Sequence, residues 1–309
     1  MDAVAATADE RRKGLWIAAG SFVMWGLMPL YWHLLKAVPS LQIVAHRVVW
    51  SALLVFAWLG WKFGRTWLRD TLSQPRLAWM LALSGLLIGF NWGLYIWAVN
   101  AGHVVETALG YFINPLLNVV IGVLFLRERL TRAQWLSVAI AAAGVLWLTF
   151  DYGRLPWIAL SLAASFALYG LLRKLAGAAP IRGLGVESLY LLLPALALLG
   201  WGQAQGAGAF AHVAPGMQAA WIAALLVFSG LLTALPLIGF AYAVQRVPYS
   251  VVGVMQYIAP TLQFLCGVLV FREPFDTHRL LGFACIWLAL AIFAGDGLRR
   301  ARAARRAAA

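Results

Sequence analysis

Charged side chains are scarce in this chain. They make up 11% of the 309 residues, whereas they form about 25% of a typical soluble domain. Hydrophobic residues reach 63%, and the mean hydropathy is +0.82. So few charges cannot cover a water-facing globule of this size. The composition therefore excludes a disordered chain and a soluble enzyme, and it predicts an all-α integral membrane protein.

Cysteine is almost absent too, and both cysteines, Cys266 and Cys285, fall in apolar stretches. This excludes a secreted disulfide scaffold. The sequence contains no CxxC, HExxH or Walker A motif and no pair of carboxylates on one helix face. Neither an ATP-driven pump nor a metal-dependent intramembrane protease is supported. We expect a protein that is not an enzyme and that uses no cofactor and no metal.

The apolar residues gather in ten stretches, each close to the roughly 20 residues that a membrane helix needs. The stretch at 14–35 follows three cations like a signal peptide, but it is longer than a signal core and recurs later in the chain. We therefore expect ten transmembrane helices, of which those at 155–172 and 186–201 are the shortest. The ten stretches are 14–35, 41–60, 77–99, 104–126, 132–150, 155–172, 186–201, 217–243, 249–271 and 279–296.

The cations mark one side of the membrane. If both ends of the chain face the cytoplasm, 19 of the 24 Lys and Arg lie on the cytoplasmic side and four on the other. This bias follows the positive-inside rule and predicts basic cytoplasmic tails at 1–13 and 297–309. The net charge of +13 is then a topology signal. It indicates contact with anionic membrane lipid and not with nucleic acid.

The two halves of the sequence repeat each other. Residues 113–128 and 258–273 are identical at eight of sixteen positions, including a proline and an Arg-Glu pair, at an offset of 145. Five residues of 19–27 recur in 163–171 at an offset of 144. We predict two five-helix repeats, 14–150 and 155–296. Because five is odd, the second repeat enters the membrane inverted, which is a plan typical of secondary transporters.

Ionisable residues inside apolar spans are candidates for function because a charge there costs about 2.5–3.5 kcal/mol on insertion scales. Arg47 lies within the second span and Glu106 near the start of the fourth. Arg47 could bind an anionic substrate group or pair with Glu106, and it could equally form a structural ion pair. Glu106 could handle substrate or protons, could pair structurally, or could lie at the membrane interface.

The fourth span carries a polar stripe in steps of four residues, which consists of Glu106, Gly110, Asn114 and Asn118. Such a stripe should face a cavity or another helix, because lipid cannot satisfy it. The matched prolines Pro115 and Pro260 are expected to kink their helices and to free carbonyl groups near Tyr111 and Gln256. Those groups could line a substrate cavity or be satisfied by neighbouring side chains.

Aromatic side chains on other spans could form a wall for an organic solute, or could serve in ordinary packing and interfacial belts. The residues in this group are Trp25, Tyr95, Trp97, Tyr169, Phe240 and Tyr242.

Two further expectations concern charges at span ends. Glu187 is expected to be solvated at the cytoplasmic edge of the seventh span, and the Arg-Glu pairs at 127–128 and 272–273 to stop their helices at the headgroups.

Four stretches resemble a known family: AHRVVWS at 45–51, NWGLYIWAVN at 91–100, ETALGYFINP at 106–115 and QYIAPT at 256–261. They are similar to RarD-type permeases of the EamA family, in the drug/metabolite transporter superfamily. The resemblance covers nearly the whole chain and implies a ten-helix inner-membrane permease built from two EamA repeats. Asn91, in the second stretch, joins the candidates for substrate binding.

The leading hypothesis is a secondary transporter that moves a small organic metabolite or drug by alternating access, with export as one of two directions left open. The alternatives are a membrane enzyme that acts on a lipid-linked substrate and a non-transporting sensor or scaffold. The expected partners are a small-molecule substrate and membrane lipid. The oligomeric state stays open.

Overall fold

The computed structural model describes residues 7–64, 66–101, 103–150, 155–211, 213–272 and 277–307, and these form helices joined by short connections, without a β-strand. The elements are α1 Ala8–Leu34, α2 Ser40–Phe63, α3 Trp67–Leu72, α4 Pro75–Asn100, α5 Val104–Leu124, α6 Arg132–Phe150, α7 Trp157–Ala176, α8 Pro180–Ala204, α9 Met217–Arg246, α10 Tyr249–Met255, α11 Ile258–Leu265, η1 Cys266–Val270 and α12 Thr277–Ala307. The last three elements before α12 follow one another as a single interrupted run.

Nine stretches among the described residues are long and apolar enough to cross a membrane. One of them is the interrupted run Tyr249–Val270. The apolar part of α5, Leu109–Leu124, is shorter than the other nine. The chain is therefore a multi-pass helical membrane protein. Each of the ten predicted apolar stretches coincides with one helix or with the interrupted run, while the short helix α3 lies in a segment that we expected to be a loop.

The predicted ends of the sixth and seventh spans are wrong. We expected 155–172 and 186–201, but α7 continues to Ala176 and α8 begins at Pro180, the first helical position that proline favours. The predicted spans stopped short of Arg173 and Glu187 because charges usually mark membrane ends. Here the two charges pair with each other inside the bundle, so the helices run through them. Gly177, in the left-handed conformation, ends α7.

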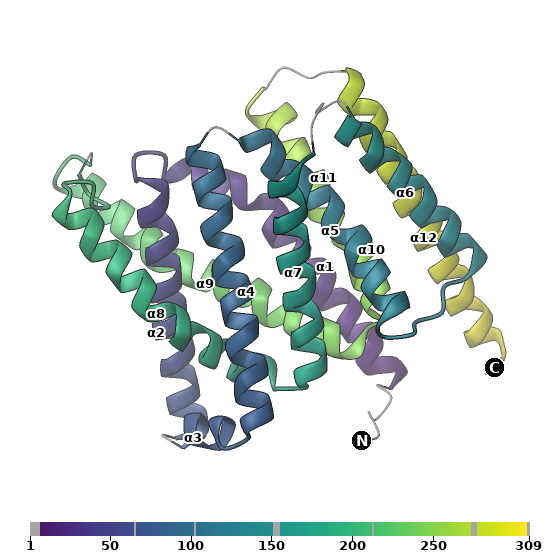
Figure 1. Ribbon diagram of the computed structural model, residues 1–309, viewed down its shortest axis with the longest axis horizontal. Helices are drawn as coiled ribbons and strands as arrows, with labels where there is room; N and C mark the ends of the chain where they lie inside the picture. The colour runs from purple at the N-terminus through teal and green to yellow at the C-terminus, as the bar shows by residue number, and fades with distance from the viewer. Residues whose placement is uncertain are drawn as a thin grey trace.

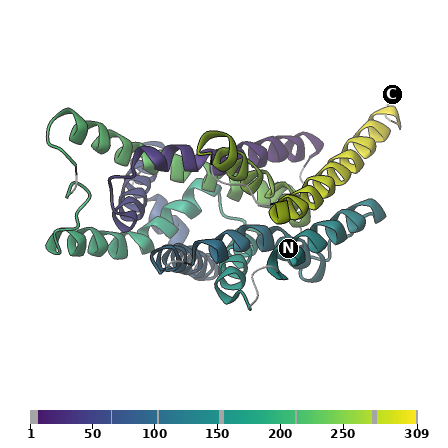
Figure 2. The same ribbon diagram turned by 90° about the horizontal axis from the view of Figure 1, so that it is seen from above.

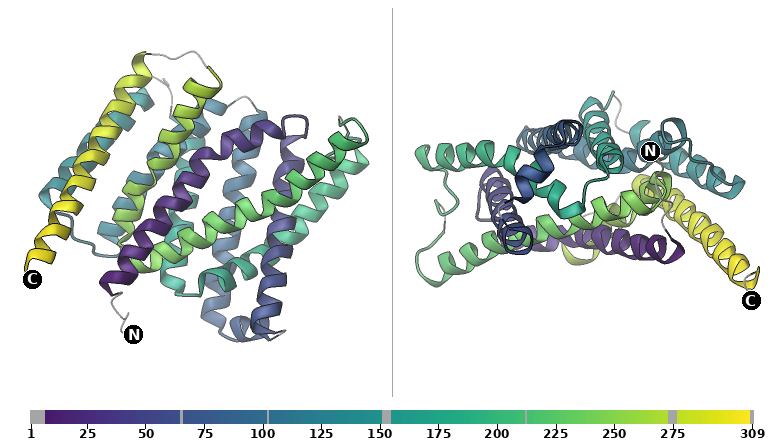
Figure 3. Two further views of the ribbon diagram at one scale, coloured as in Figure 1. Left: turned by 180° about the vertical axis from the view of Figure 1, so that it is seen from behind. Right: turned by 90° about the horizontal axis from the view of Figure 1, so that it is seen from below.

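Helices from the two halves of the chain alternate in the bundle (Figure 1). Helix α7 packs between α4 and α5, α9 packs against α1 and α2, and α2 also packs against α8. The pair α6 and α12 forms one edge of the molecule (Figures 2 and 3). Helix α1 begins and α12 ends at the same end of the bundle (Figure 1). We call this end the terminal end and the other the opposite end.

Side chains seal the terminal end by satisfying helix carbonyl groups. Lys174 Nζ, near the end of α7, donates to the carbonyls of Val244 and Val247 at 2.7 and 3.0 Å. Gln245 Nε2 donates to the carbonyl of Ala178 at 2.7 Å. The last carbonyls of a helix lack partners within the helix, and a cation there is stabilised by the helix dipole. These bonds therefore tie the ends of α7 and α9 together.

Glu128 closes the same end between α5 and α10. Its carboxylate accepts hydrogen bonds from the backbone N–H groups of Tyr249 and Ser250 at 2.5 and 2.8 Å, and from the hydroxyl of Ser250 at 2.6 Å. The first N–H groups of a helix have no partner within it, and a carboxylate there also meets the positive end of the dipole. Thus Glu128 does more than stop its own helix at the headgroups, because it caps a helix of the other half.

Glu187 is fully buried, so the expectation that it is solvated is wrong. Its side chain is 1% exposed, as is that of Arg173, and the two form an ion pair with Nη1 and Oε1 3.3 Å apart. Arg173 Nη2 also donates to the carbonyl of Pro180 at 2.9 Å. Gly183 makes room for the guanidinium, since a Cβ there would lie 1.7 Å from Nη1.

We expect the substitution E128A to destabilise the protein by about 2–4 kcal/mol, because it leaves two helix N–H groups and a hydroxyl without their charged acceptor. The substitution E10A is a matched control, since Glu10 accepts from the N–H of Thr7 at the exposed start of α1 and should cost about 0.5–1 kcal/mol. Thermal unfolding in detergent, followed by tryptophan fluorescence, measures both. Equal midpoints for the two variants would contradict the capping role of Glu128.

We expect G183A to lower the midpoint of unfolding strongly. The added methyl group would displace a guanidinium that has no route to solvent, and disrupting a buried ion pair typically costs about 3–5 kcal/mol. Gly20 is the matched control, because it is exposed and a Cβ there meets no described atom within 4 Å. In a helix, G20A should be neutral or stabilising by up to about 1 kcal/mol. The same unfolding assay compares them, and a G183A midpoint equal to that of G20A would refute the tight fit.

Candidate functional site

A cavity of about 250 Å³ lies in the middle of the bundle. The helix segments around it are those nearer the opposite end, and they come from both halves of the chain. Its lining residues are Trp25, Met28, Pro29, Trp32, Arg47, Asn91, Trp92, Tyr95, Thr107, Gly110, Tyr111, Asn114, Leu162, Phe166, Thr233, Leu237, Gln256, Ala259, Pro260 and Gln263. The cavity therefore combines an aromatic wall with amides, hydroxyls and one cation.

This cation is Arg47, whose guanidinium contacts two indole rings and donates one hydrogen bond. Its Cζ lies 4.8 Å from the ring centroid of Trp32 and 5.5 Å from that of Trp92. Its Nε donates to Thr233 Oγ1 at 3.0 Å. Among the described side chains no carboxylate forms an ion pair with Arg47. Within the described part of the site, Arg47 is therefore held by two cation–π contacts and one hydrogen bond.

Amide side chains on the other wall are fixed by hydrogen bonds. Asn91 Nδ2 donates to the carbonyl of Leu162 at 2.8 Å and to Ser165 Oγ at 2.9 Å, which ties α4 to α7. Asn114 Nδ2 donates to the carbonyl of Ala163 at 3.1 Å. Asn91 uses both of its amide hydrogens and Asn114 one of its two, so the two amides are fixed parts of the wall and also hold the helices together.

A chain of three amides, Asn114, Asn118 and Gln256, crosses between the halves. Asn118 is completely buried, and its Nδ2 donates to Gln256 Oε1 at 2.6 Å and to Asn114 Oδ1 at 3.2 Å. The polar stripe of α5 thus continues below the cavity as a chain of amides that ends at Gln256, where α10 stops. Both readings of the stripe apply, since Asn114 lines the cavity and Asn118 joins helices.

Tyr95 and Tyr111 face each other at the cavity, with ring centroids 6.2 Å apart in an edge-on arrangement. Their side chains stay 37% and 43% exposed, unlike the buried core aromatics. Water or a solute can therefore reach this part of the cavity wall. Both hydroxyls belong to the same cavity as the guanidinium of Arg47.

An aromatic floor closes the cavity toward the terminal end. We use this name for Phe22, Trp25, Phe166, Tyr169 and Phe240. The rings of Trp25 and Phe166, which line the cavity, are 6.0 Å apart. Phe240 packs against both, at 6.0 and 5.4 Å, and stacks on Tyr169 at 6.1 Å. Since Phe240 and Tyr169 are 0% and 1% exposed, no solute passes this layer in the present conformation.

The structure brings together most of the residues predicted for the site. Arg47, Trp25, Asn91, Tyr95, Tyr111, Asn114, Gln256 and Pro260 all line the central cavity. Tyr169 lies in the floor instead, and Tyr242 lies away from the cavity, beneath the guanidinium of Arg246 at 3.7 Å. Helix α5 contains Glu106, whose side chain lies outside the described part of the structure.

The two matched prolines differ in their effect. Helix α5 runs without a break through Pro115, which is buried and does not line the cavity. In the second half, the helix is interrupted at Gln256 and Tyr257, just before Pro260. The carbonyl of Gln256 accepts from the N–H of Ala259 at 3.1 Å, so this freed carbonyl is satisfied locally. The expected pair of interruptions is therefore present in one half only.

Several lining residues escaped the sequence analysis, above all Trp32, Trp92 and Thr233. Trp92 follows a predicted residue in the NWG stretch, but tryptophan is common throughout this chain and carries little signal by itself. Thr233 lies in a uniformly apolar span and becomes notable only through its bond to Arg47.

Comparisons with known proteins agree with this architecture. Residues 12–150 match the EamA-like transporter family. A protein named RarD from Streptomyces exfoliatus is 46% identical over 96% of this chain and 93% of its own length. An uncharacterized transporter, YojE, from Bacillus subtilis is 44% identical over 96% of this chain and 98% of its own length.

The fold also resembles a solved crystal structure with a TM-score of 0.68, at 18% identity, over 91% of this chain and 96% of the other. That likeness concerns the fold alone. The near full-length identity to the curated relatives, together with the family match, settles the family. The chain belongs to the RarD-type members of the EamA-like transporter family.

Proposed function

We propose that the protein is a secondary transporter that carries a small organic solute across the inner membrane by alternating access. The observation that carries this proposal is the central cavity, which is lined by helices of both halves and contains one cation, Arg47, held between aromatic rings and a hydroxyl. A site between two halves of a bundle can face either side when the halves tilt, which is the basis of alternating access.

The packing of the helices supports the proposed inverted repeat. Let α1, α2, α4, α5 and α6 correspond to α7, α8, α9, the α10–α11–η1 run and α12. Under this correspondence the contact α1–α9 becomes α7–α4, the contact α2–α9 becomes α8–α4, and the contact α1–α11 becomes α7–α5. Each of these contacts is present in the structure. The pairs α2–α8, α5–α10 and α6–α12 map onto themselves. A two-fold relation between the repeats 14–150 and 155–296 accounts for this pattern.

Local backbone geometry agrees with the same relation. Arg127 and Arg272 are 145 residues apart, and both have φ of +54°, a value that non-glycine residues rarely adopt. They are the described non-glycine residues with positive φ. A conformation this unusual at equivalent positions supports a duplicated backbone. In the proposed topology both ends of the chain are cytoplasmic, and the terminal end of the bundle faces the cytoplasm with most of the cations.

The cavity supports a solute with an anionic group and a flat apolar body. The guanidinium of Arg47 donates one hydrogen bond to a described residue, through Nε. Its terminal N–H groups form the planar fork that matches a carboxylate. Trp25 and Phe166 supply flat faces below it. At about 250 Å³ the cavity is smaller than the roughly 300–1,000 Å³ of drug-sized sites, which favours a small metabolite.

No observation on the described residues favours the membrane enzyme or the sensor. The described lining of the cavity contains no carboxylate and no His or Cys, so it offers no acid–base pair of the kind that hydrolysis needs. In addition, a sensor or scaffold would not need a cavity that reaches partly exposed tyrosines.

Flux into and out of proteoliposomes tests the proposal. The panel contains 4-hydroxybenzoate, its neutral amide, aromatic amino acids, aliphatic carboxylates and chloramphenicol. We expect saturable flux of at least one aromatic carboxylate, because the site joins a cation to flat apolar walls. Empty liposomes give the background. Absence of protein-dependent flux for every solute, with protein that unfolds cooperatively, would refute transport of this solute class.

We expect R47Q to weaken binding of 4-hydroxybenzoate at least about tenfold, which corresponds to about 1.4 kcal/mol, and to leave binding of the neutral amide almost unchanged. R47K keeps the charge but loses the planar fork and the bond to Thr233, so it should fall between the two. Quenching of tryptophan fluorescence measures binding, since Trp25, Trp32 and Trp92 line the cavity.

The matched control for this charge change is R76Q, which removes an exposed cation at the start of α4 and should have no effect on binding. Equal loss of the carboxylate and the amide in R47Q would mean that Arg47 acts only through packing. An unchanged affinity for the carboxylate would remove Arg47 from the site.

A further inference from the structure

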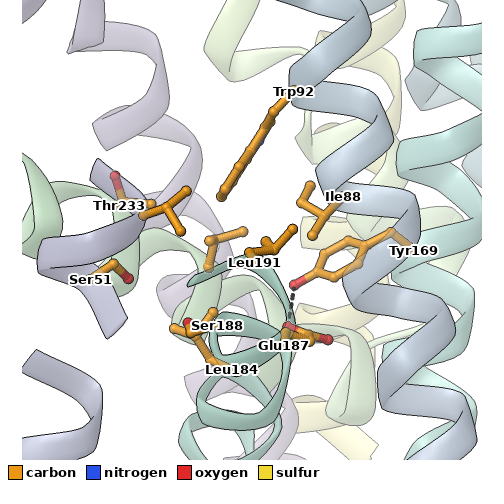
Figure 4. A pocket seen from close by; sticks show the side chains of 11 residues that line it. Ser51, Ile88, Trp92, Tyr169, Leu184, Glu187, Ser188, Leu191 and Thr233 are labelled. Carbon is orange, nitrogen blue, oxygen red and sulfur yellow. Dashed lines mark hydrogen bonds between the residues drawn. The ribbon is translucent and has the colours of Figure 1, made fainter. Parts of the chain in front are cut away.

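A second polar cluster lies on the far side of the aromatic floor, toward the terminal end. We call it the Glu187 cluster, and it consists of Glu187 and Ser188 on α8, Arg173 and Tyr169 on α7, and Ser84 on α4. Ser84 Oγ donates to Glu187 Oε1 at 2.5 Å, and the Tyr169 hydroxyl donates to Oε2 at 3.4 Å (Figure 4). With the ion pair to Arg173, this carboxylate joins three transmembrane segments at one point.

Ser84 can serve this carboxylate in two protonation states. Its Oγ lies within hydrogen-bond distance of two acceptors, Glu187 Oε1 at 2.5 Å and the carbonyl of Leu81 at 3.0 Å, but it has one hydrogen. When Glu187 is ionised, Ser84 donates to it. When Glu187 is protonated, its hydroxyl can donate to Ser84, whose hydrogen then turns to Leu81. The hydrogen bond between Ser84 and Glu187 is therefore kept in both states, whereas the ion pair with Arg173 exists only in the ionised one.

A small space lies between the cluster and residues that also line the central cavity, namely Trp92, Thr233 and Leu237. It has a volume of about 10 Å³ and is lined by Glu187 together with Ser51, Ser188 and Thr233 (Figure 4). A space of about this size with several polar partners is at the lower limit for one water molecule. Thr233 also lines the central cavity and accepts the bond from Arg47. Thr233 is therefore a residue that the small space and the central cavity have in common.

The groups that face Glu187 are few. Helix α7 presents the cation Arg173 and the phenol of Tyr169, and α4 presents Ser84. Helices α2 and α9 present hydroxyls and apolar groups at the small cavity. Tyr249 of α10 lies behind the cluster, where its hydroxyl donates to the carbonyl of Ala167 at 2.6 Å. Arg173 is therefore the described charge that opposes the carboxylate, and its Nε has no hydrogen bond within the described structure.

We propose that Glu187 is the proton-binding residue of the transport cycle, and that its protonation releases α7 from α4 and α8 at the terminal end. This inference rests on the proposed transport function. In the present conformation, the proton exchanges with the central cavity through the small space that Glu187 and Thr233 both line. When the terminal end opens, it exchanges with water on that side. The proton moves from water to a carboxylate oxygen of Glu187 and returns to water from the same group.

The position of Arg173 makes the release possible. It lies on the last turn of α7, three residues before Ala176, and it is held there by Glu187 and the carbonyl of Pro180. Neutralising the carboxylate leaves a buried cation without a counter-charge, which is strongly unfavourable. Because α7 ends one turn later, the cation can reach water when the helix ends separate. Protonation therefore favours an open terminal end.

Infrared spectroscopy of the protein in lipid tests the proton site without any solute. We expect the band of a carboxylic acid to grow as the pH is lowered, because the proposed role requires Glu187 to bind a proton. This band should be absent in E187Q. The matched control D70N changes an exposed carboxylate on α3 and should keep it. A wild-type spectrum with no band that E187Q removes would overturn the proposal.

Spin labels at L175C on α7 and R69C on α3, in a background without Cys266 and Cys285, test the movement. Both positions are exposed, and α3 packs against α8. We expect a longer distance to gain population at low pH, and no such change in the E187Q background. A distance distribution that is independent of pH in the wild type would refute the release of α7.

The double variant R173M/E187L tests the proposal even if E187Q fails to fold. Replacing both members of a buried ion pair by apolar residues is often neutral or stabilising, so this variant should fold and should lack both the band and the movement. If the double variant keeps the pH-dependent movement, the pair is only structural. If a solute moves but Glu187 does not titrate, this inference fails alone. If Glu187 titrates and α7 moves while no solute is carried, the transport proposal fails instead.

Discussion

A charge inside a membrane bundle has to be satisfied by the protein, because lipid offers it no partner. Two of the cations that the structure describes inside the bundle, Arg173 and Arg47, are held in different ways. Arg173 receives a carboxylate, a carbonyl and a neighbouring glycine that makes room for it. Arg47 receives two indole rings and one hydroxyl. The first arrangement closes the space around the cation, whereas the second keeps a cavity beside it. The positions of the seal and of the cavity follow from this difference.

The aromatic floor separates the two cations and also relates them. In the proposed repeat, Phe22 corresponds to Phe166 and Trp25 to Tyr169, at the offset of 144. Trp25 faces the central cavity, and its counterpart Tyr169 faces Glu187. The floor thus contains equivalent residues from both halves, one turned toward each end. Tilting of the halves would exchange these roles, so that Tyr169 would line an open space at the terminal end while Trp25 became buried.

Much of the fold could be predicted from the sequence, because membrane helices are encoded by composition over long windows. The ten apolar stretches correspond to the helices, and the motif stretches supplied seven of the eight predicted residues that line the cavity. The errors arose where a pairing in space decides the outcome. The ends of α7 and α8 and the burial of Glu187 depend on an ion pair between residues 14 positions apart, across a turn. Hydropathy treats each of these charges singly, and so it places both at the membrane edge.

Residues such as Thr233 and Trp32 could not be predicted for the same kind of reason. Each is ordinary in its own helix and becomes part of the site only because another helix brings Arg47 beside it. Asn118 belongs to the predicted polar stripe, but its partner Gln256 comes from the other half and is known only from the packing. Local sequence thus identifies the charge that requires a partner, and the packing of the two halves identifies the partner.

The two halves are nevertheless unequal in their charges, and this inequality bears on the cycle. At the offset of 145, Glu187 corresponds to Gln42 and Arg47 to Leu192. Gln42 is buried, and its Nε2 donates to the carbonyl of Leu198 at 3.1 Å, so it joins α2 to α8 without a charge. Two states related by a perfect two-fold axis would have equal free energies. A carboxylate on one side and an amide on the other break that equality, so the proposed protonation of Glu187 would change the balance between the two states. The repeated fold makes the two conformations possible, and the residues that differ between the repeats set the relative free energies of those conformations.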